Sequence, residues 1–482
     1  MKFVFLLTVA VMLANTANGQ TCNCESNFEW MKKTFEENDA GFQYIIDKKG
    51  QASYNIHNQL ILEKIREVTT SMECTGLLYE WMKFFRSGHI GIEPLTRETP
   101  VQQNASKSIN KPVIQETWNG NISQFEKYIE EKIIADYEGI WDIGNGTYKI
   151  GIKKEGVNYI GFIIESTVDT WKPGLVKLKI EQYDGEMKST SYMRDHSPVI
   201  SDEPTLMGNN YLQIGVQTLK RLKPVFPNDP FVDNYLKYRS AQTSYLEELN
   251  ETTLYLRIPS FELDSKSAID IVIAENKDKI LKTENLIIDL RNNGGGSDRS
   301  FAELLPFLYT NPIRNISVEF FSTPKNNKRY VDLLTNTEID EDSRQLIKNL
   351  YEKLQEKLGE YVNPFGEDVS IHQNDVVYEY PKNVGIIINK GNASSTEQFL
   401  LAAKQSKKVK LFGETTMGAL DISNLNFIES PCGEFNLWYC TSRSLRIPGM
   451  TIDDIGLQPD YYIDKTIPND KWVKFVNDIL NQ

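Results

Sequence analysis

A turn that contains Ser394 and Ser395 follows one of the most apolar runs of the chain, Val-Gly-Ile-Ile-Ile at 384–388. A helical pattern begins directly after the turn, so the serine hydroxyls lie at a helix N-terminus, where developing negative charge is stabilised. Such a position suits a nucleophile. The same residues are ordinary helix N-caps, and Glu397, three residues after Ser394, completes the pattern of a capping box. Taken alone, the turn favours capping over catalysis.

A glycine-rich turn follows the other short apolar run, which spans 286–288. It reads Asp-Leu-Arg-Asn-Asn-Gly-Gly-Gly-Ser at 289–297. Its consecutive glycines allow positive φ and close backbone approach, so their N–H groups can form a nest for an anion. The residues alone fit a tight connection without a ligand slightly better than an oxyanion or phosphate site.

General bases are scarce, because the chain has only four histidines: His57, His89, His196 and His372. His89 lies in Ser-Gly-His-Ile-Gly, after a helical pattern, where the glycines leave its ring accessible. A lone histidine at a helix end is more often a cap or a partner of the helix dipole. The chain lacks both His-Glu-x-x-His and Gly-x-x-x-x-Gly-Lys, so neither a metal nor a cofactor is predicted.

Two regions precede the turns that could carry chemistry. Apolar residues recur at helical spacing from Phe28 to Phe85, which predicts two to four packed helices. Between Trp118 and Val199 the pattern alternates, which predicts a small antiparallel β module. The tryptophans of this module fit a core better than a peptide groove; they are Trp118, Trp141 and Trp171.

The turns themselves belong to a third region, which runs from about Thr253 to the C-terminus. The apolar runs at 286–288 and 384–388 are too short for buried helices. They predict buried strands joined by helical crossovers, and therefore an α/β fold. A helix predicted at about 343–362 carries a leucine at every fourth position, which predicts core packing; the leucines are Leu346, Leu350, Leu354 and Leu358.

Composition and charge exclude several classes of protein. The 482 residues are 40% hydrophobic and 25% charged, which is typical of a globular chain of about three folding units. Acidic residues outnumber basic ones by 66 to 53, so nucleic acid is not an expected partner. Lys2, the apolar 3–13 and the small residues up to Gly19 predict a secretory signal, and no later run is long enough to span a membrane. We therefore expect an exported protein, periplasmic or extracellular.

The five cysteines fit an oxidising compartment, because they are too few and too far apart for a thiolate zinc cluster. We expect Cys432 and Cys440 to close a local loop. Cys74 then pairs with Cys22 or Cys24, and one thiol is left over.

The order and spacing of these pieces resemble the C-terminal processing, or tail-specific, protease family. Five motifs between about 253 and 463 carry the resemblance: a strand followed by Pro-Ser-Phe, the Asp-Leu-Arg-Asn-Asn-Gly-Gly turn, Ala-Ser-x-x-Glu, Gly-Glu-Thr-Thr-Met-Gly and Gly-Leu-Gln-Pro-Asp. The resemblance implies a crotonase-like catalytic domain with a ββα superhelical fold, preceded by the helical region and the antiparallel β module. No PDZ-like segment is recognisable, so specificity for C-terminal tails is not implied.

The resemblance also implies the base and the nucleophile. Ser394 matches the family's nucleophile, which lies three residues before the glutamate of its turn. In the branch with a Ser-Lys dyad, the lysine directly follows Gly-Glu-x-Thr-x-Gly, where this chain has Ala419. The chain therefore looks like the tricorn-core branch, whose base is a histidine from before the catalytic core. His89 matches that histidine.

The same branch has an acid just ahead of the Gly-x-x-Pro-Asp motif. Asp453 matches it, with Asp454 as its rival and with aspartate in place of the usual glutamate. The resemblance implies an oxyanion hole formed by the N–H groups of Gly295 and Ser395. In this triad the histidine takes the serine proton and the acid holds the imidazole in one tautomer.

The prediction is a secreted serine endopeptidase that cleaves unfolded proteins or peptides without metal or cofactor. The domains expected are a signal peptide at 1–19, a helical region at 20–100, a linker and β-rich module at 101–245 and the catalytic domain at 246–482. Two alternatives stay open. One is a peptide- or ligand-binding protein that keeps the fold without useful catalysis, and the other is an assembly protein that works through its helical region. The oligomeric state is not predicted.

Overall fold

The computed structural model describes residues 22–95, 116–183, 186–215, 217–336 and 340–482. The predicted signal peptide and most of the predicted linker lie outside these ranges. The described chain divides into two compact units. Unit 1 combines the N-terminal region up to residue 95 with 245–462, and unit 2 combines 116–244 with 463–482.

A six-stranded sheet forms the centre of unit 1, in the order β11-β12-β13-β18-β19-β22. Strands β12 to β22 pair in parallel and β11 pairs antiparallel with β12. The two predicted apolar runs lie side by side in β13 and β18, so this prediction of the α/β fold is confirmed. The strands are β11 (Tyr245–Asn250), β12 (Thr253–Arg257), β13 (Asn285–Asp289), β18 (Asn383–Ile388), β19 (Val409–Gly413) and β22 (Tyr461–Tyr462).

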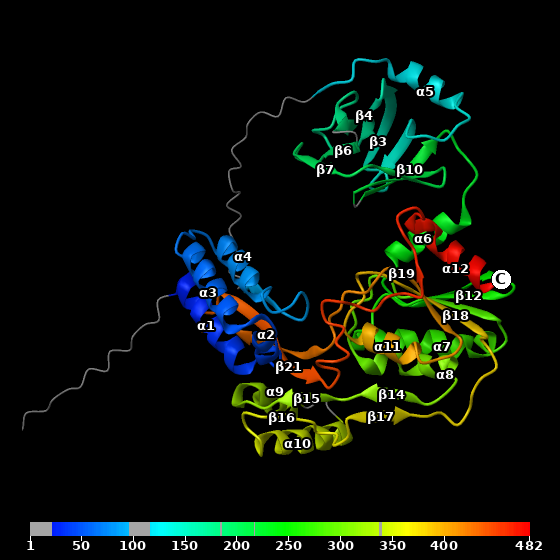
Figure 1. Cartoon of the computed structure of the whole chain (residues 1–482). Coiled ribbons are helices and arrows are strands. Elements are labelled where there is room, and N and C mark those ends of the chain that lie inside the picture. The colour runs from blue at the N-terminus through cyan, green and yellow to red at the C-terminus, as the bar shows by residue number, and fades with distance from the viewer. Residues whose placement is uncertain (1–21, 96–115, 184–185, 216, 337–339) are drawn as a thin grey trace, which may run out of the picture. The chain divides into compact units, whose positions relative to one another are not determined.

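Helices α7 (Lys266–Ile280), α8 (Leu305–Leu308) and α11 (Ser395–Ala403) cover one face of this sheet (Figure 1). Alternate strand residues such as Leu286 and Ile288 point to that face and pack against Phe399 and Leu400 of α11. Because β13 and β18 are parallel neighbours, the turns that follow them leave the sheet at the same edge. The glycine-rich turn and the Ser394 turn are therefore brought together.

A second sheet in unit 1 has the order β1-β21-β15-β16, with β20 paired to β21, and a separate ladder joins β14 to β17. The helices of this part are α9 (Pro324–Leu334) and α10 (Glu341–Gln355), and η1 (Leu263–Ser265) and η2 (Asp298–Leu304) are short 3-10 helices. The strands are β1 (Gly91–Pro94), β14 (Ile313–Ile316), β15 (Val318–Phe321), β16 (Tyr361–Val362), β17 (Val369–His372), β20 (Ile422–Glu429) and β21 (Phe435–Ser444).

Helix α10 corrects the prediction of a core stripe at 343–362. The helix ends at Gln355, and of the four leucines only Leu350 and Leu354 belong to a core cluster, together with Ile347 and Tyr351 of the same helix. Leu346 is 69% exposed and Leu358 is 49% exposed. With 3.6 residues per turn, a four-residue spacing rotates steadily away from a fixed contact face, so the ends of such a stripe leave the core.

Four helices form the N-terminal part of unit 1: α1 (Cys24–Asn38), α2 (Phe42–Lys49), α3 (Gln51–Ile65) and α4 (Ser71–Met82). Their number agrees with the two to four helices predicted. Their aromatic core, which includes Phe35 and Trp81, packs against Phe435 and Leu437 of β21. The helices therefore share a core with the second sheet of the same unit.

Two disulfides hold this helical part, and one expected pairing is wrong. Cys24 pairs with Cys74, which was one of the predicted alternatives, and Cys22 pairs with Cys432. Cys440 is a buried free thiol. Its Sγ points into the interior, 3.3 Å from the backbone oxygen of His89, so it cannot close a local loop with Cys432.

Unit 2 contains a nine-stranded antiparallel sheet in the order β7-β6-β5-β4-β3-β2-β10-β9-β8, as alternation predicts. Trp141 and Trp171 are buried, and the half-buried Trp118 stacks on Phe162, so these tryptophans are core residues. The elements are α5 (Ile122–Glu130), β2 (Gly139–Ile143), β3 (Tyr148–Glu155), β4 (Asn158–Ser166), β5 (Val176–Tyr183), β6 (Glu186–Tyr192), β7 (Pro198–Ser201), β8 (Thr205–Met207), β9 (Tyr211–Ile214), β10 (Gln217–Lys223), α6 (Pro230–Ser240), η3 (Asn469–Lys471) and α12 (Trp472–Leu480).

In the part of the chain that the structure describes, no helix combines the length and the apolar character needed to cross a membrane.

Candidate active site

Ser394 adopts a backbone conformation that few residues other than glycine adopt, with φ 57° and ψ −128°. Its side chain makes no capping hydrogen bond to α11, so the capping role favoured by the sequence is wrong. The Ser394 N–H donates to the backbone oxygen of Ala419 at 2.9 Å. A strained, partly exposed serine whose hydroxyl is not used by its own helix is a typical arrangement for a nucleophile.

Glu397 does not complete a capping box either. Its buried carboxylate accepts the N–H groups of Gly418 and Ala419, both at 2.8 Å, and the Thr416 hydroxyl. Burial raises the pKa of Glu397, while these hydrogen bonds oppose that shift. Glu397 therefore ties the loop at 416–419 to the first turn of α11 and so holds the Ala419 carbonyl that anchors Ser394.

The glycine-rich turn packs directly on the Ser394 turn. Gly295 has φ 100°, and a Cβ added there would lie 2.8 Å from both the Ser394 Cβ and the Ser395 nitrogen. Only glycine fits this close approach. In the structure the Gly295 N–H donates to Asn293 Oδ1 at 3.0 Å, and the same oxygen accepts the Thr396 hydroxyl at 2.8 Å. The Gly295 N–H must leave Asn293 before it can bind an oxyanion.

Ser395 is the first residue of α11, a position whose N–H has no acceptor within the helix. Its side-chain hydroxyl donates to the backbone oxygen of Gly296 at 3.1 Å. Both predicted oxyanion donors therefore lie beside Ser394. They differ because the Gly295 N–H is already bound to the Asn293 side chain.

His89 also has a left-handed backbone, with φ 56°. Its Nδ1 lies 2.7 Å from the backbone oxygen of Ile422, at the start of β20. A carbonyl can only accept, so Nδ1 carries the proton and Nε2 is left with a lone pair. Burial lowers the pKa of His89, the Arg86 charge lowers it further, and the hydrogen bond to Ile422 opposes both. The imidazole is thus held as a neutral base.

The loop at 87–89 lies against the residue that anchors Ser394. A Cβ added at Gly88 would lie only 2.5 Å from the Ala419 Cβ. The Ser87 N–H and hydroxyl donate to Asp454 Oδ1 at 3.0 and 2.7 Å, which fastens the loop from the other side. Ala419 therefore contacts both the histidine loop and the serine turn.

Asp453 does not contact His89 as the predicted acid would. Its carboxylate accepts the backbone N–H groups of Leu420, Asp421 and Ile422 at 2.7, 2.6 and 3.0 Å. Burial, with the neighbouring charge of Asp421, raises the pKa of Asp453. Because both carboxylate oxygens bind backbone N–H groups of 420–422, Asp453 is connected to His89 through the segment that carries the Ile422 carbonyl.

Asp421 completes this arrangement from the opposite side. Its buried carboxylate accepts the N–H groups of Ile452 and Asp453 at 2.6 and 3.0 Å and pairs with Arg446 at 2.7 Å. Asp421 and Asp453 therefore each bind the backbone of the other's segment. This reciprocal pairing fixes the position of the carbonyl that orients His89.

A buried ion pair supports the histidine loop from the N-terminal helices. Arg86 Nη2 pairs with Asp39 Oδ2 at 2.5 Å, and the same nitrogen donates to the backbone oxygen of His89 at 3.3 Å. Asp39 accepts the backbone N–H of Cys440 at 3.1 Å. Sequence reasoning missed Asp39 and Arg86, and the one available signal is that Arg86 lies three residues before His89.

Residues 252–463, a little under half of the chain, match the model of Peptidase family S41. This match supports the resemblance to the C-terminal processing proteases that the five motifs carry. The family implies a peptidase of the serine type.

The whole chain is also similar in fold to solved peptidase structures. Mature CPAF has a TM-score of 0.50 at 13% identity, over 95% of this chain and 96% of that one. The photosystem II D1 C-terminal processing protease has a TM-score of 0.37 at 12% identity, over 96% and 98%. The tricorn protease has a TM-score of 0.38 at 12% identity, over 95% of this chain and 36% of the tricorn chain. No curated protein matches the chain.

Proposed function

We propose that this chain is an exported serine endopeptidase in which Ser394 is the nucleophile and His89 the general base. The observation that carries the proposal is the Ser394 turn, whose hydroxyl is not used for capping and whose anchor, Ala419, touches the histidine loop. In keeping with the family, we also propose a crotonase-like superhelical arrangement for the domain at 246–482.

In the proposed reaction, Nε2 of His89 takes the proton from Ser394 as Oγ attacks the peptide carbonyl carbon. The oxyanion that forms is bound by the Ser395 N–H and by the Gly295 N–H after it turns from Asn293. The tetrahedral intermediate collapses when His89 gives its proton to the leaving amine. Water, deprotonated by the same imidazole, then hydrolyses the acyl-serine.

In this proposal Asp453 supports His89 indirectly, instead of binding the imidazole as the acid of a triad does. It is proposed as a positioning residue, because its carboxylate holds Ile422, and the Ile422 carbonyl holds the imidazole in the Nδ1–H tautomer. A neutral carbonyl stabilises an imidazolium less than a carboxylate does, so we expect a moderate rather than a fast peptidase.

Export is proposed from two features. The N-terminal sequence has the pattern of a secretory signal that ends near Gly19. The two disulfides support the proposal, because disulfides are typical of oxidising compartments outside the cytosol. Mass spectrometry of the exported protein is expected to find a mature chain that begins near Gln20.

A second candidate, a binding protein without useful catalysis, is favoured by two specific observations. The Gly295 N–H is bound to Asn293, and Asp453 does not reach His89. In such a protein the Ser394 turn would hold a peptide that is never cut.

Cleavage of an intrinsically unfolded protein separates the two candidates. We expect the wild-type protein to cut it and Ser394→Ala to lose at least about 10³-fold in rate. Ser406→Ala, which removes a hydroxyl three residues after the C-terminal end of α11, is the matched control and should retain activity. Equal cutting by wild type and Ser394→Ala would reject the proposed nucleophile, and binding without cutting by the wild type would favour the second candidate.

A further inference from the structure

A pocket of about 560 Å³ opens in unit 1. Its walls are largely apolar and include Phe301, Leu305 and Phe320. Pockets of this size commonly hold one large side chain or a small ligand.

The pocket lies along one face of α11, the helix that follows Ser394. Gln398 and Ala402 line it, and their four-residue spacing places them on one side of the helix. The Gln398 N–H also donates to the Ser394 backbone oxygen at 3.0 Å. Asp298, another lining residue, interacts with the side chain of Ser395. A substrate bound at Ser394 therefore has this pocket within reach of a neighbouring side chain.

The charged groups on the pocket wall have one sign. Asp298 and Glu367 line it, and none of the described residues on its wall is a lysine or an arginine. Arg446 approaches Gln398 from behind at 3.4 Å, but its charge is balanced by Asp421. Asp298 and Glu367 are both exposed residues, so an incoming cation can reach their carboxylates.

A second arginine lies behind the opposite wall. Arg329 donates to the backbone oxygen of Asn424, which lines the pocket, at 3.3 Å. Its guanidinium also donates to the Thr441 hydroxyl at 3.2 Å. Arg329 therefore binds acceptors of the protein itself and does not line the pocket. The charged residues on the pocket wall are the two carboxylates, Asp298 and Glu367.

From this combination of an apolar wall, two carboxylates and a position beside Ser394, we infer that the pocket selects a lysine or arginine next to the cleaved bond. The inference rests on the proposed peptidase function. The methylene groups of such a side chain contact the aromatic and aliphatic wall, and its charged end reaches Asp298 or Glu367. The pocket therefore sets the substrate class to polypeptides with basic residues.

Binding to the full-length Ser394→Ala protein tests the inference without relying on cleavage. The probes are Ala-rich octapeptides that differ at one position, which is Arg, Lys, norleucine or Glu. We expect the Arg and Lys peptides to bind about 10-fold more tightly than the norleucine peptide, and we expect the preference to shrink with salt. Asp298→Asn should remove most of the preference, and Asp298→Lys should shift it toward Glu.

The net charge of −13 attracts cationic peptides to any part of the surface, so a control is needed. Asp278→Asn removes an exposed carboxylate on α7 outside the pocket and should leave the preference unchanged. Equal binding of the norleucine and Arg peptides, or a preference that survives both Asp298→Asn and Glu367→Gln, overturns the inference.

Cleavage-site mapping on unfolded proteins gives a second, independent readout. With wild-type protein we expect Lys or Arg beside most cleaved bonds. Cutting that depends on Ser394 but shows no such enrichment overturns the pocket inference and leaves the peptidase proposal standing. If the wild type cuts nothing, the peptidase proposal fails, and the binding series still decides the preference of the pocket.

Discussion

The two units each hold a histidine with a left-handed backbone, His89 in unit 1 with φ 56° and His196 in unit 2 with φ 68°. Burial lowers the pKa of both. The His89 ring is fixed by the Ile422 carbonyl in a loop that touches the anchor of Ser394, whereas the His196 ring stacks on Trp171 with centroids 4.1 Å apart. A left-handed backbone and a lowered pKa therefore do not by themselves identify a catalytic histidine. The groups that surround each ring distinguish the two histidines.

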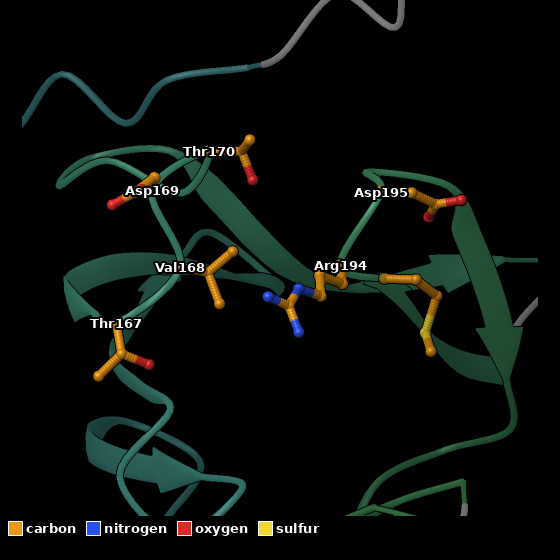
Figure 2. Close-up of a pocket in the computed structure, with 7 residues that line it drawn as sticks. Thr167, Val168, Asp169, Thr170, Arg194 and Asp195 are labelled. Atoms are coloured by element: carbon orange, nitrogen blue, oxygen red, sulfur yellow. The ribbon is translucent and has the colours of Figure 1, made fainter.

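Pockets show the same contrast. A pocket of about 590 Å³ in unit 2 lies between the loops at 167–170 and 193–195, and Figure 2 shows Arg194 and Asp195 on one loop and Thr167 to Thr170 on the other. The Asp195 carboxylate is bound within its own turn by Ser197, at 2.6 Å from the hydroxyl. This pocket is as large as the one in unit 1, but its lining includes no residue of α11, the helix that follows Ser394. Size alone does not make a site.

Replacing each histidine in turn gives the largest expected difference between the units. His89→Ala should lower kcat/KM for an unfolded substrate by about 10²–10⁴-fold, because a positioned general base contributes that much. His196→Ala should leave cleavage unchanged, because its ring serves packing in unit 2. A loss of similar size in both variants, measured on folded protein, would contradict the assignment.

The next largest effect is expected on the free energy of unfolding, when one partner of the buried Arg86–Asp39 ion pair is removed. Asp39→Asn leaves Arg86 buried and uncompensated, which typically costs about 3–5 kcal/mol in the free energy of unfolding. Glu130→Gln breaks an exposed pair with Lys223 in unit 2 and should barely move the urea midpoint. Equal midpoints for the two variants would show that the buried pair does not stabilise unit 1.

Asp453 and Asp454 can be separated by their effects on rate. Asp453→Asn should lower kcat by about 10–100-fold with little change in KM, as is typical of groups that orient a catalytic residue through another group. Asp454→Asn releases only Ser87 and should cost less. If Asp454→Asn proves the more damaging, the rival acid is the correct one.

The smallest expected effect is a shift in the pH dependence of the peptidase activity. Burial lowers the pKa of His89, so the neutral base persists to a lower pH than an ordinary histidine of pKa 6.5. The activity should therefore be constant near pH 7 and fall on the acid side with a midpoint below 6.5, since only the neutral ring accepts the serine proton. An acid midpoint above 6.5 in kcat/KM would mean that another group limits the rate.

The sequence predicted the parallel strands, the N-terminal helices and the β module, because each has strong periodicity. It also predicted the turns at Gly295 and Ser394, because short motifs mark them. It could not predict the Ile422 carbonyl as the partner of His89, since every residue has a carbonyl and only tertiary structure selects one. The reach of Asp453 and the pairing of Cys432 failed for the same reason: both depend on distances between segments that are far apart in the chain.

The contact between Gly88 and Ala419 limits the side chain that this chain can carry at position 419. A lysine there would extend from the Cβ against which Gly88 packs. Ala419→Lys is therefore expected to displace the loop at 87–89, and His89 with it, rather than to add a second base beside the histidine.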